Sequence, residues 1–251
     1  MIVTGERVIT AEGGFNPTWQ RHVATYRLCA DLLPEDERVL DLGCGVGHSF
    51  ELLAPRETVG VDIEPSVLEG QNRETVVADM RKLPFDDTSF KAAISVQALE
   101  HIPDPERMLS QVRRVLELNG VGVFVTPNRL TFGSPEEIID PYHYHEFDPE
   151  QLRTLMAAWF KEVRILGIFG SARHLKFVAA EHRRLRLMLH LDPLRLRRFI
   201  PRRIRQLLYD TSLTLARRRP NPAAEAIGQE DFYLAEEPLD EALDLVAVVT
   251  R

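Results

Sequence analysis

The chain has 251 residues, 44% of them hydrophobic and 27% charged, with a net charge of −7. This balance is typical of a globular α/β domain and argues against general nucleic-acid binding. Two cysteines exclude a disulfide framework, no apolar run approaches the ~20 residues of a membrane span, and the N-terminus lacks a signal-peptide pattern, so we expect a cytoplasmic protein.

Apolar runs alternate with segments of helical period along most of the chain. Helical connections are predicted at 48–53, 66–70 and 105–118. Strands that alternate with helices indicate a parallel, Rossmann-like α/β sheet, whose ligands bind at the carboxyl ends of the strands. The predicted strands are 38–42, 58–62, 75–78, 92–96, 121–126, 163–169 and 243–250.

A glycine-rich loop follows the first predicted strand, in the sequence VLDLGCGVG. Alternate glycines leave a loop without side chains, so its backbone N–H groups can approach a ligand at the start of the next helix. The Gly-x-Gly-x-Gly spacing differs from the Gly-x-Gly-x-x-Gly of a dinucleotide site. The carboxylate of Asp41 suits a cationic or amine-bearing ligand better than a pyrophosphate.

Two more carboxylates follow the next strands. Asp62 lies 19 residues after Gly43, where it can accept hydrogen bonds from both hydroxyls of a ribose. Asp79 follows the third strand, where an adenine amino group would lie. The plainer alternatives are a helix cap for Asp62 and a turn residue for Asp79. Together with the loop, both are interpreted as ligand contacts.

These blocks resemble the class I S-adenosylmethionine-dependent methyltransferases, in the small-molecule group that includes ubiquinone-biosynthesis and sugar O-methyltransferases. The resemblance covers about residues 36–170 and resumes at the last strand. It implies a seven-stranded, mostly parallel sheet with helices on both faces and a final antiparallel strand beside strand six. The implied cofactor is S-adenosyl-L-methionine.

The resemblance also assigns cofactor contacts, in the glycine loop, at the strand ends and in an N-terminal segment that would close over the cofactor. These are Asp41, Gly43, Cys44, Gly45 and Gly47 for the methionyl part, Asp62 with Ile63 beside it for the ribose, Asp79 and Met80 for the adenine, Val96 and Gln97 at the methyl-transfer site, and Arg21 and Tyr26 over the carboxylate end.

A hydroxyl acceptor needs a general base or a metal ion that acidifies it. Glu100 and His101 resemble the second half of a Glu-x-x-Glu-His metal site known in some ubiquinone-pathway and RNA-terminal ribose methyltransferases, and His143 would complete it. Here Gln97 replaces the first Glu, which lowers the affinity for Mg²⁺. Because similar motifs occur in relatives that need no metal, metal dependence stays open.

Without a metal, His143 or His145 is the predicted base, because histidine titrates near neutral pH. Alternation along the chain would direct both histidines to one side and Tyr142 and Tyr144 to the other. A histidine that only bonds a backbone carbonyl is the alternative for His145, and a loop-holding role is the alternative for His101. The catalytic candidates are His143, His101, Glu100 and His145.

About 70 residues separate the last two predicted strands, and this segment is basic. Residues 173–219 hold 14 Lys/Arg against 3 Asp/Glu, a local net charge of +11. We expect a helical insertion that forms a lid, binds the acceptor or pairs two copies in a homodimer. Its amphipathic part could contact an anionic membrane surface or a phosphate group, while a solvated face is the plainer alternative.

The chain therefore divides into an N-terminal leader (1–35), a cofactor-binding core (36–170), a basic insertion (171–240) and a final core strand (241–251). The expected activity is methyl transfer from S-adenosyl-L-methionine to a hydroxyl of a small molecule, such as a sugar, glycolipid or natural product. The alternatives are transfer to nitrogen or carbon, an NAD-dependent oxidoreductase, and a cofactor-binding module without catalysis.

Overall fold

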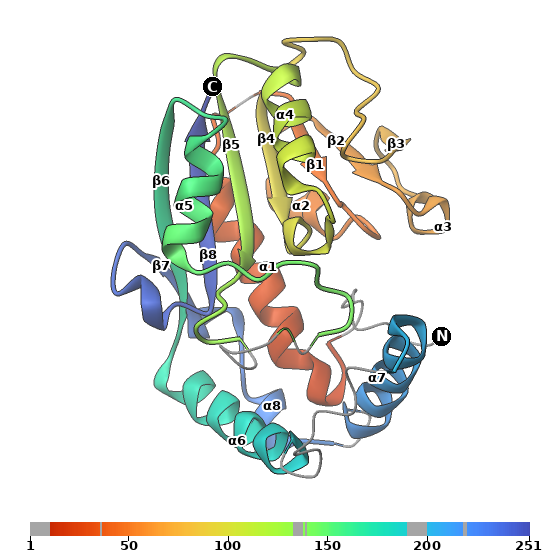
Figure 1. Cartoon of the computed structure of the whole chain (residues 1–251), viewed down its shortest axis with the longest axis vertical. Helices are drawn as coiled ribbons and strands as arrows, with labels where there is room; N and C mark the ends of the chain where they lie inside the picture. The colour runs from red at the N-terminus through yellow and green to blue at the C-terminus, as the bar shows by residue number, and fades with distance from the viewer. Residues whose placement is uncertain (1–10, 36, 133–137, 139, 190–199, 218–219) are drawn as a thin grey trace.

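A computed structural model describes residues 11–251, except 36, 133–137, 139, 190–199 and 218–219 (Figure 1). The start of the predicted leader and the centre of the predicted insertion lie outside the described residues. One eight-stranded sheet organises the chain, in the order β3-β2-β1-β4-β5-β8-β6-β7. The strands are β1 Val39–Leu42, β2 Thr58–Asp62, β3 Thr75–Val77, β4 Phe90–Val96, β5 Leu116–Pro127, β6 Glu162–Gly170, β7 Phe232–Ala235 and β8 Asp244–Thr250.

The strands from β3 to β5 pair in parallel, and β8 lies antiparallel between β5 and β6. The predicted antiparallel position of the last strand beside strand six is therefore confirmed. The predicted count of seven strands is wrong, because β7 pairs antiparallel with β6 at the edge of the sheet. This short strand lies inside the segment predicted to be a helical insertion.

Several helices begin at residues that favour a helix N-terminus. Asp104 caps α4 through a hydrogen bond from Arg107 N, and Pro105 occupies its first position. The predicted helix at 105–118 is three residues too long, because β5 starts at Leu116 and extends the sheet there. The helices are α1 Asn16–Ala30, α2 Ser49–Leu53, α3 Pro65–Leu68, α4 Pro105–Val115, α5 Pro149–Ala157, α6 Ala172–Leu189, α7 Arg202–Arg217 and α8 Pro222–Glu225.

Side-chain alternation along the strands divides the core into two layers. Leu40 and Leu42 of β1 pack in the cluster that contains α4 and α5, whereas Val39 packs with α1 on the other face. Figure 1 shows α4 and α5 in front of the sheet. Asp41 shares the parity of Val39, so its carboxylate lies on the α1 face, at the carboxyl end of β1.

The carboxyl ends of the parallel strands meet at one edge of the sheet, and α6 and α7 lie beyond that edge (Figure 1). Asn16 at the start of α1 ties this helix to the chain that follows α7, because its side-chain amide donates to the carbonyls of Ala224 and Ile227, each at 2.8 Å. Within the part of the chain that the structure describes, no helix is both long and apolar enough to cross a membrane.

Candidate active site

The loop after β1 requires glycine for steric reasons. Gly43, Gly45 and Gly47 all have positive φ angles, of 75°, 53° and 85°. A Cβ on Gly43 would lie 2.8 Å from the Cβ of Ala98, at the end of β4. The loop therefore presents bare backbone at the strand ends, as its predicted ligand-binding role requires.

Asp41 lies beneath this loop and is fully buried. Its carboxylate accepts hydrogen bonds from Tyr26 Oη at 3.1 Å and Ser49 Oγ at 2.5 Å, and it pairs with Arg73 Nη2 at 3.2 Å. Burial raises the pKa of Asp41, and the charge of Arg73 opposes this rise. With partners from α1, α2 and the segment before β3, Asp41 organises the loop from within. A direct contact between Asp41 and the methionyl part of a cofactor stays a prediction, as does the role of Tyr26.

The Cys44 thiol is also buried within the loop. A Cβ on Gly60 of β2 would lie only 2.7 Å from its sulfur atom, so the thiol fills the space above β2 that a side chain would need. Burial raises the pKa of the Cys44 thiol.

The two carboxylates predicted to bind the nucleoside have different surroundings. Asp62 is buried at the end of β2 and accepts hydrogen bonds from Gly45 N at 3.0 Å and Glu64 N at 2.9 Å. Asp79 is partly exposed, and its hydrogen bonds from the Arg81 side chain lower its pKa. Each carboxylate oxygen can accept a further bond. Their neighbours also differ, since Ile63 is exposed and Met80 lies near the loop at Gly43.

Gln97 occupies a strained position directly after β4, close to the buried Val96. Its φ of 54° is unusual for a residue other than glycine and costs on the order of 1–2 kcal/mol. Its side-chain amide donates to Asp244 Oδ1 at 2.8 Å, and Arg21 Nε lies 3.4 Å from Asp244 Oδ2. Burial raises the pKa of Asp244. Two of the predicted contacts, Gln97 and Arg21, thus converge on a carboxylate at the start of β8.

Glu100 follows Gln97 in the short turn η2 (Leu99–His101) and is fully buried. Its Oε2 accepts a hydrogen bond from Thr126 Oγ1 at 3.0 Å. Its Oε1 has no hydrogen-bond partner among the described residues. Burial raises the pKa of Glu100 to about 7, against a smaller lowering by His143. A buried acceptor of this kind is costly unless a proton, a ligand or an ion binds it.

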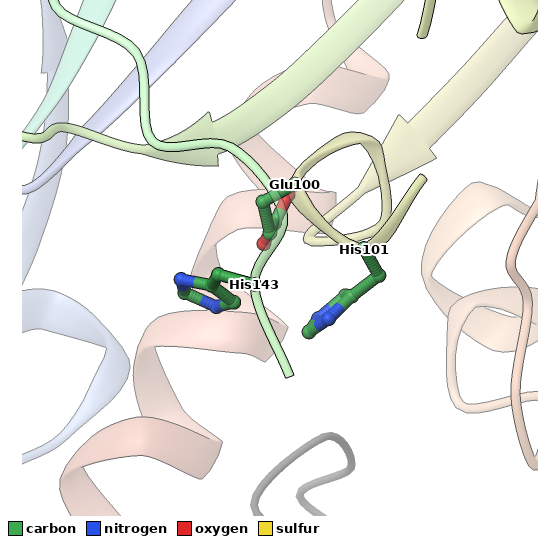
Figure 2. A group of neighbouring side chains, drawn as sticks. All are labelled: Glu100, His101 and His143. Carbon is green, nitrogen blue, oxygen red and sulfur yellow. The ribbon is translucent and has the colours of Figure 1, made fainter. Parts of the chain in front are cut away.

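Figure 2 shows Glu100 and His101, from the turn after β4, beside His143, from the segment after β5. Their ligand atoms all lie within 4.8 Å of one another. The rings of His101 and His143 meet edge-on, with centroids 5.0 Å apart. The structure therefore brings three of the four predicted catalytic residues together.

The fourth candidate lies apart from this group. His145 Nε2 contacts the carbonyl oxygen of Pro103 at 3.3 Å, and its ring stacks on Phe147. The two tyrosines face the other way, toward α7: Tyr142 Oη donates to Asp210, and Tyr144 lies under the guanidinium of Arg202.

His143 has a partner that the sequence analysis did not single out. Its Nδ1 lies 3.1 Å from Glu146 Oε1, and both side chains are buried. Burial lowers the pKa of His143, but the hydrogen bond to Glu146 and the charges of Asp140 and Glu100 outweigh it and raise the pKa overall. A neutral His143 that donates from Nδ1 keeps its Nε2 lone pair for a proton.

Other residues were missed as well, and the sequence offered a signal for some of them. Asp244 is an acidic residue at the start of an otherwise apolar run, which in an antiparallel strand lies at the ligand-binding edge. Glu146 lies three residues after His143. The positions of Arg73 and Ser49 become visible only in the folded chain. The missed residues are Ser49, Arg73, Thr126, Glu146 and Asp244.

Comparisons with known proteins agree with this geometry. A family model described as "Methyltransferase domain" matches residues 40–124. A probable S-adenosylmethionine-dependent methyltransferase of Mycobacterium tuberculosis is 31% identical over 191 residues, which cover 72% of this chain and 69% of that protein. Another, from Mycolicibacterium smegmatis, is 27% identical, with coverage of 99% and 95%. A solved methyltransferase of this kind from Thermotoga maritima has the same fold, with a TM-score of 0.60, 17% identity and coverage of 92% and 90%.

The raised pKa of Glu100 predicts a specific pH dependence of stability. Between its ordinary pKa of 4.5 and its folded pKa of about 7, only the folded state keeps the Glu100 proton, so stability falls as the pH rises through this window. The loss is roughly 3 kcal/mol. Glu100→Gln removes this titration. We measure the free energy of unfolding in urea with EDTA present. Between pH 4.5 and pH 7, the free energy of unfolding of Glu100→Gln should rise by this amount relative to that of wild type.

The matched control is Glu57→Gln, which neutralises an exposed carboxylate and should leave the pH profile unchanged. A stability difference between wild type and Glu100→Gln that stays constant with pH would mean that Glu100 titrates normally.

Proposed function

Because this chain belongs to the S-adenosylmethionine-dependent methyltransferase family, we propose that it methylates a hydroxyl group of a small molecule such as a sugar, glycolipid or natural product. The observation that carries the hydroxyl assignment is the buried pair of His143 and Glu146 beside Glu100. A hydroxyl must lose its proton during methyl transfer, whereas a neutral amine can attack without a base. Family membership argues against the alternative of an NAD-dependent oxidoreductase.

The glycine loop is the part of the chain that fits the cofactor. A side chain at Gly43 would collide with Ala98, so this position keeps bare backbone at the strand ends. We expect the loop to hold the methionyl part, Asp62 the ribose and Asp79 the adenine. When bound, S-adenosyl-L-methionine supplies a methyl group that its sulfonium already activates, so the protein must mainly align the acceptor and remove a proton.

His143 is the residue that we assign to proton removal. Its Nδ1 is engaged by Glu146, which orients the ring and leaves Nε2 to accept the hydroxyl proton. The raised pKa makes the imidazole a stronger base than an isolated histidine. His145 is a weaker candidate, because its Nε2 already contacts the carbonyl of Pro103.

A metal ion is a second candidate for the activation of the acceptor, and the unpartnered Glu100 Oε1 favours it. Glu100, His101 and His143 would hold the ion, which would lower the pKa of a bound hydroxyl. Two imidazoles and one carboxylate suit Zn²⁺, Mn²⁺ or Fe²⁺ better than Mg²⁺, which prefers oxygen ligands. The amide oxygen of Gln97, whose nitrogen donates to Asp244, would be one further oxygen ligand and would still leave two imidazoles in the set. The donor set therefore does not fit Mg²⁺.

Asp62→Ala should weaken the binding of S-adenosyl-L-methionine at least about tenfold, because it removes a charge-assisted contact with the ribose. Isothermal titration calorimetry measures the affinity directly. Glu57→Ala, at an exposed carboxylate elsewhere in the chain, is the matched control and should bind normally. If the Asp62 variant is folded and binds with wild-type affinity, the ribose assignment is wrong.

His143→Ala should keep its affinity for S-adenosyl-L-methionine while kcat falls at least about 100-fold, because the proton acceptor is lost. Turnover is followed as release of S-adenosylhomocysteine over a panel of sugar and glycolipid acceptors. His145→Ala is the matched control and should remain active. Glu146→Gln should shift the acidic limb of the pH–rate profile to lower pH, because the carboxylate raises the pKa of His143. Full activity of His143→Ala would remove this residue from the mechanism.

Removal of metal ions separates the two candidates for activation. If Glu100, His101 and His143 hold an ion, dialysis against EDTA should abolish turnover, and Zn²⁺ or Mn²⁺ should restore it better than Mg²⁺. His101→Ala should then lower the affinity for the ion, as measured by metal titration of the dialysed protein. Turnover that is insensitive to EDTA would leave His143 as the base and end the metal hypothesis.

A further inference from the structure

Helix α7 is amphipathic in the reverse of the usual sense, with polar residues directed toward the protein and apolar residues directed outward. Its exposed side chains Ile204, Leu207, Leu208 and Leu215 have exposed fractions of 49%, 62%, 55% and 64%. At 100° per residue these four positions fall within one arc of about 100°. They form a largely apolar stripe along the helix, in which the exposed Thr211 is the polar member, and we call it the outer stripe.

The inner face of α7 is held by polar contacts, which fix the orientation of the helix. Arg202 donates from Nε to the carbonyl of Pro141 at 2.8 Å and from Nη2 to that of Tyr142 at 2.9 Å. Two tyrosine–aspartate pairs cross the same interface: Tyr142 Oη donates to Asp210 at 2.5 Å and Tyr209 Oη to Asp140 at 3.1 Å. A rotation that buried the outer stripe would break all of these bonds.

The charge around the outer stripe indicates what covers it. Helical periodicity places Arg203 and Arg205 beside its two edges, but only Arg203 is exposed, whereas Arg205 is half-buried and its Nε lies out of contact with solvent. The long basic side chain of Arg203 can reach past the apolar face to anionic groups. The stretch of sequence that contains α7, residues 173–219, has a net charge of +11, whereas the rest of the chain is acidic. A symmetric pairing of two copies through α7 would bring two such basic segments together, which like-charge repulsion disfavours.

We propose that α7 is an interfacial membrane-binding helix, which inserts its outer stripe into the surface of an anionic lipid bilayer while the exposed Arg203 contacts the headgroups. The helix lies in the plane of the surface, because its apolar arc runs along its length. Since its inner face holds the segment that carries His143, docking brings this segment close to the lipid. The inference is independent of the proposed reaction, because vesicle binding needs neither cofactor nor acceptor.

Cosedimentation of the full chain with lipid vesicles tests this proposal. We expect binding to vesicles of phosphatidylglycerol and phosphatidylcholine, at least about tenfold weaker binding to phosphatidylcholine alone, and a loss of binding as the salt concentration rises. The double variant Leu207→Ser/Leu208→Ser should lower the affinity for the anionic vesicles at least about tenfold. Leu118→Ser is the matched control, since Leu118 is 77% exposed but lies in β5, and it should bind like wild type.

Calorimetry with S-adenosyl-L-methionine checks that the double variant is folded. A loss of vesicle binding by a folded variant then reports on the outer stripe, whichever acceptor the enzyme uses. Binding that does not distinguish the two vesicle types, or a double variant that binds like wild type, would overturn the proposal. Sedimentation equilibrium tests the alternative that a second copy of the chain packs on the outer stripe. A dimer that dissociates on Leu207→Ser/Leu208→Ser, without vesicle binding by wild type, would identify a second copy of the chain and refute the membrane assignment.

Discussion

The fully buried carboxylate of Asp41 is the constraint on which the glycine loop and the strand ends around it depend. A charge without water must be matched by hydrogen bonds or by an opposite charge. Tyr26, Ser49 and Arg73 provide them, and they come from α1, α2 and the segment before β3. Because these three partners surround one carboxylate, three separate parts of the chain meet around the end of β1. The glycine loop runs over this assembly, so its shape is set from beneath before a ligand arrives.

The segment that carries His143 is joined to the turn after β4 through the backbone of Glu100. Its carbonyl oxygen accepts hydrogen bonds from the amides of both Tyr144 and His145, at 2.8 and 3.3 Å. This connection places His143 over the Glu100 side chain, although 43 positions separate them in sequence. The same segment is held on its outer side by α7. The turn after β4, the proposed base and α7 are therefore joined through one short stretch of chain.

The sequence predicted what local patterns determine and missed what depends on distant partners. The strand at 58–62 is predicted to the residue, because β-branched residues in a short run favour a strand, and all five of its residues are buried in the sheet. Strand β7 was missed, since its four residues form a strand only by pairing with β6. At the site, glycine spacing and strand-end carboxylates predict the cofactor contacts, and the structure places these residues at one edge of the sheet. Nothing local marked Arg73, because its contact with Asp41 spans 32 positions.

The burial of Cys44 has a consequence for the redox chemistry of the loop. Only the thiolate reacts readily with oxidants and alkylating reagents, and a thiol with a raised pKa is almost wholly protonated near neutral pH. A sulfur atom packed against Gly60 is also shielded from attack. The glycine loop therefore contains a cysteine whose thiol should resist oxidation by peroxide while the loop stays in place. Iodoacetamide should accordingly label Cys44 only when the loop has moved away from β2 and exposed the thiol, so the labelling rate measures this opening.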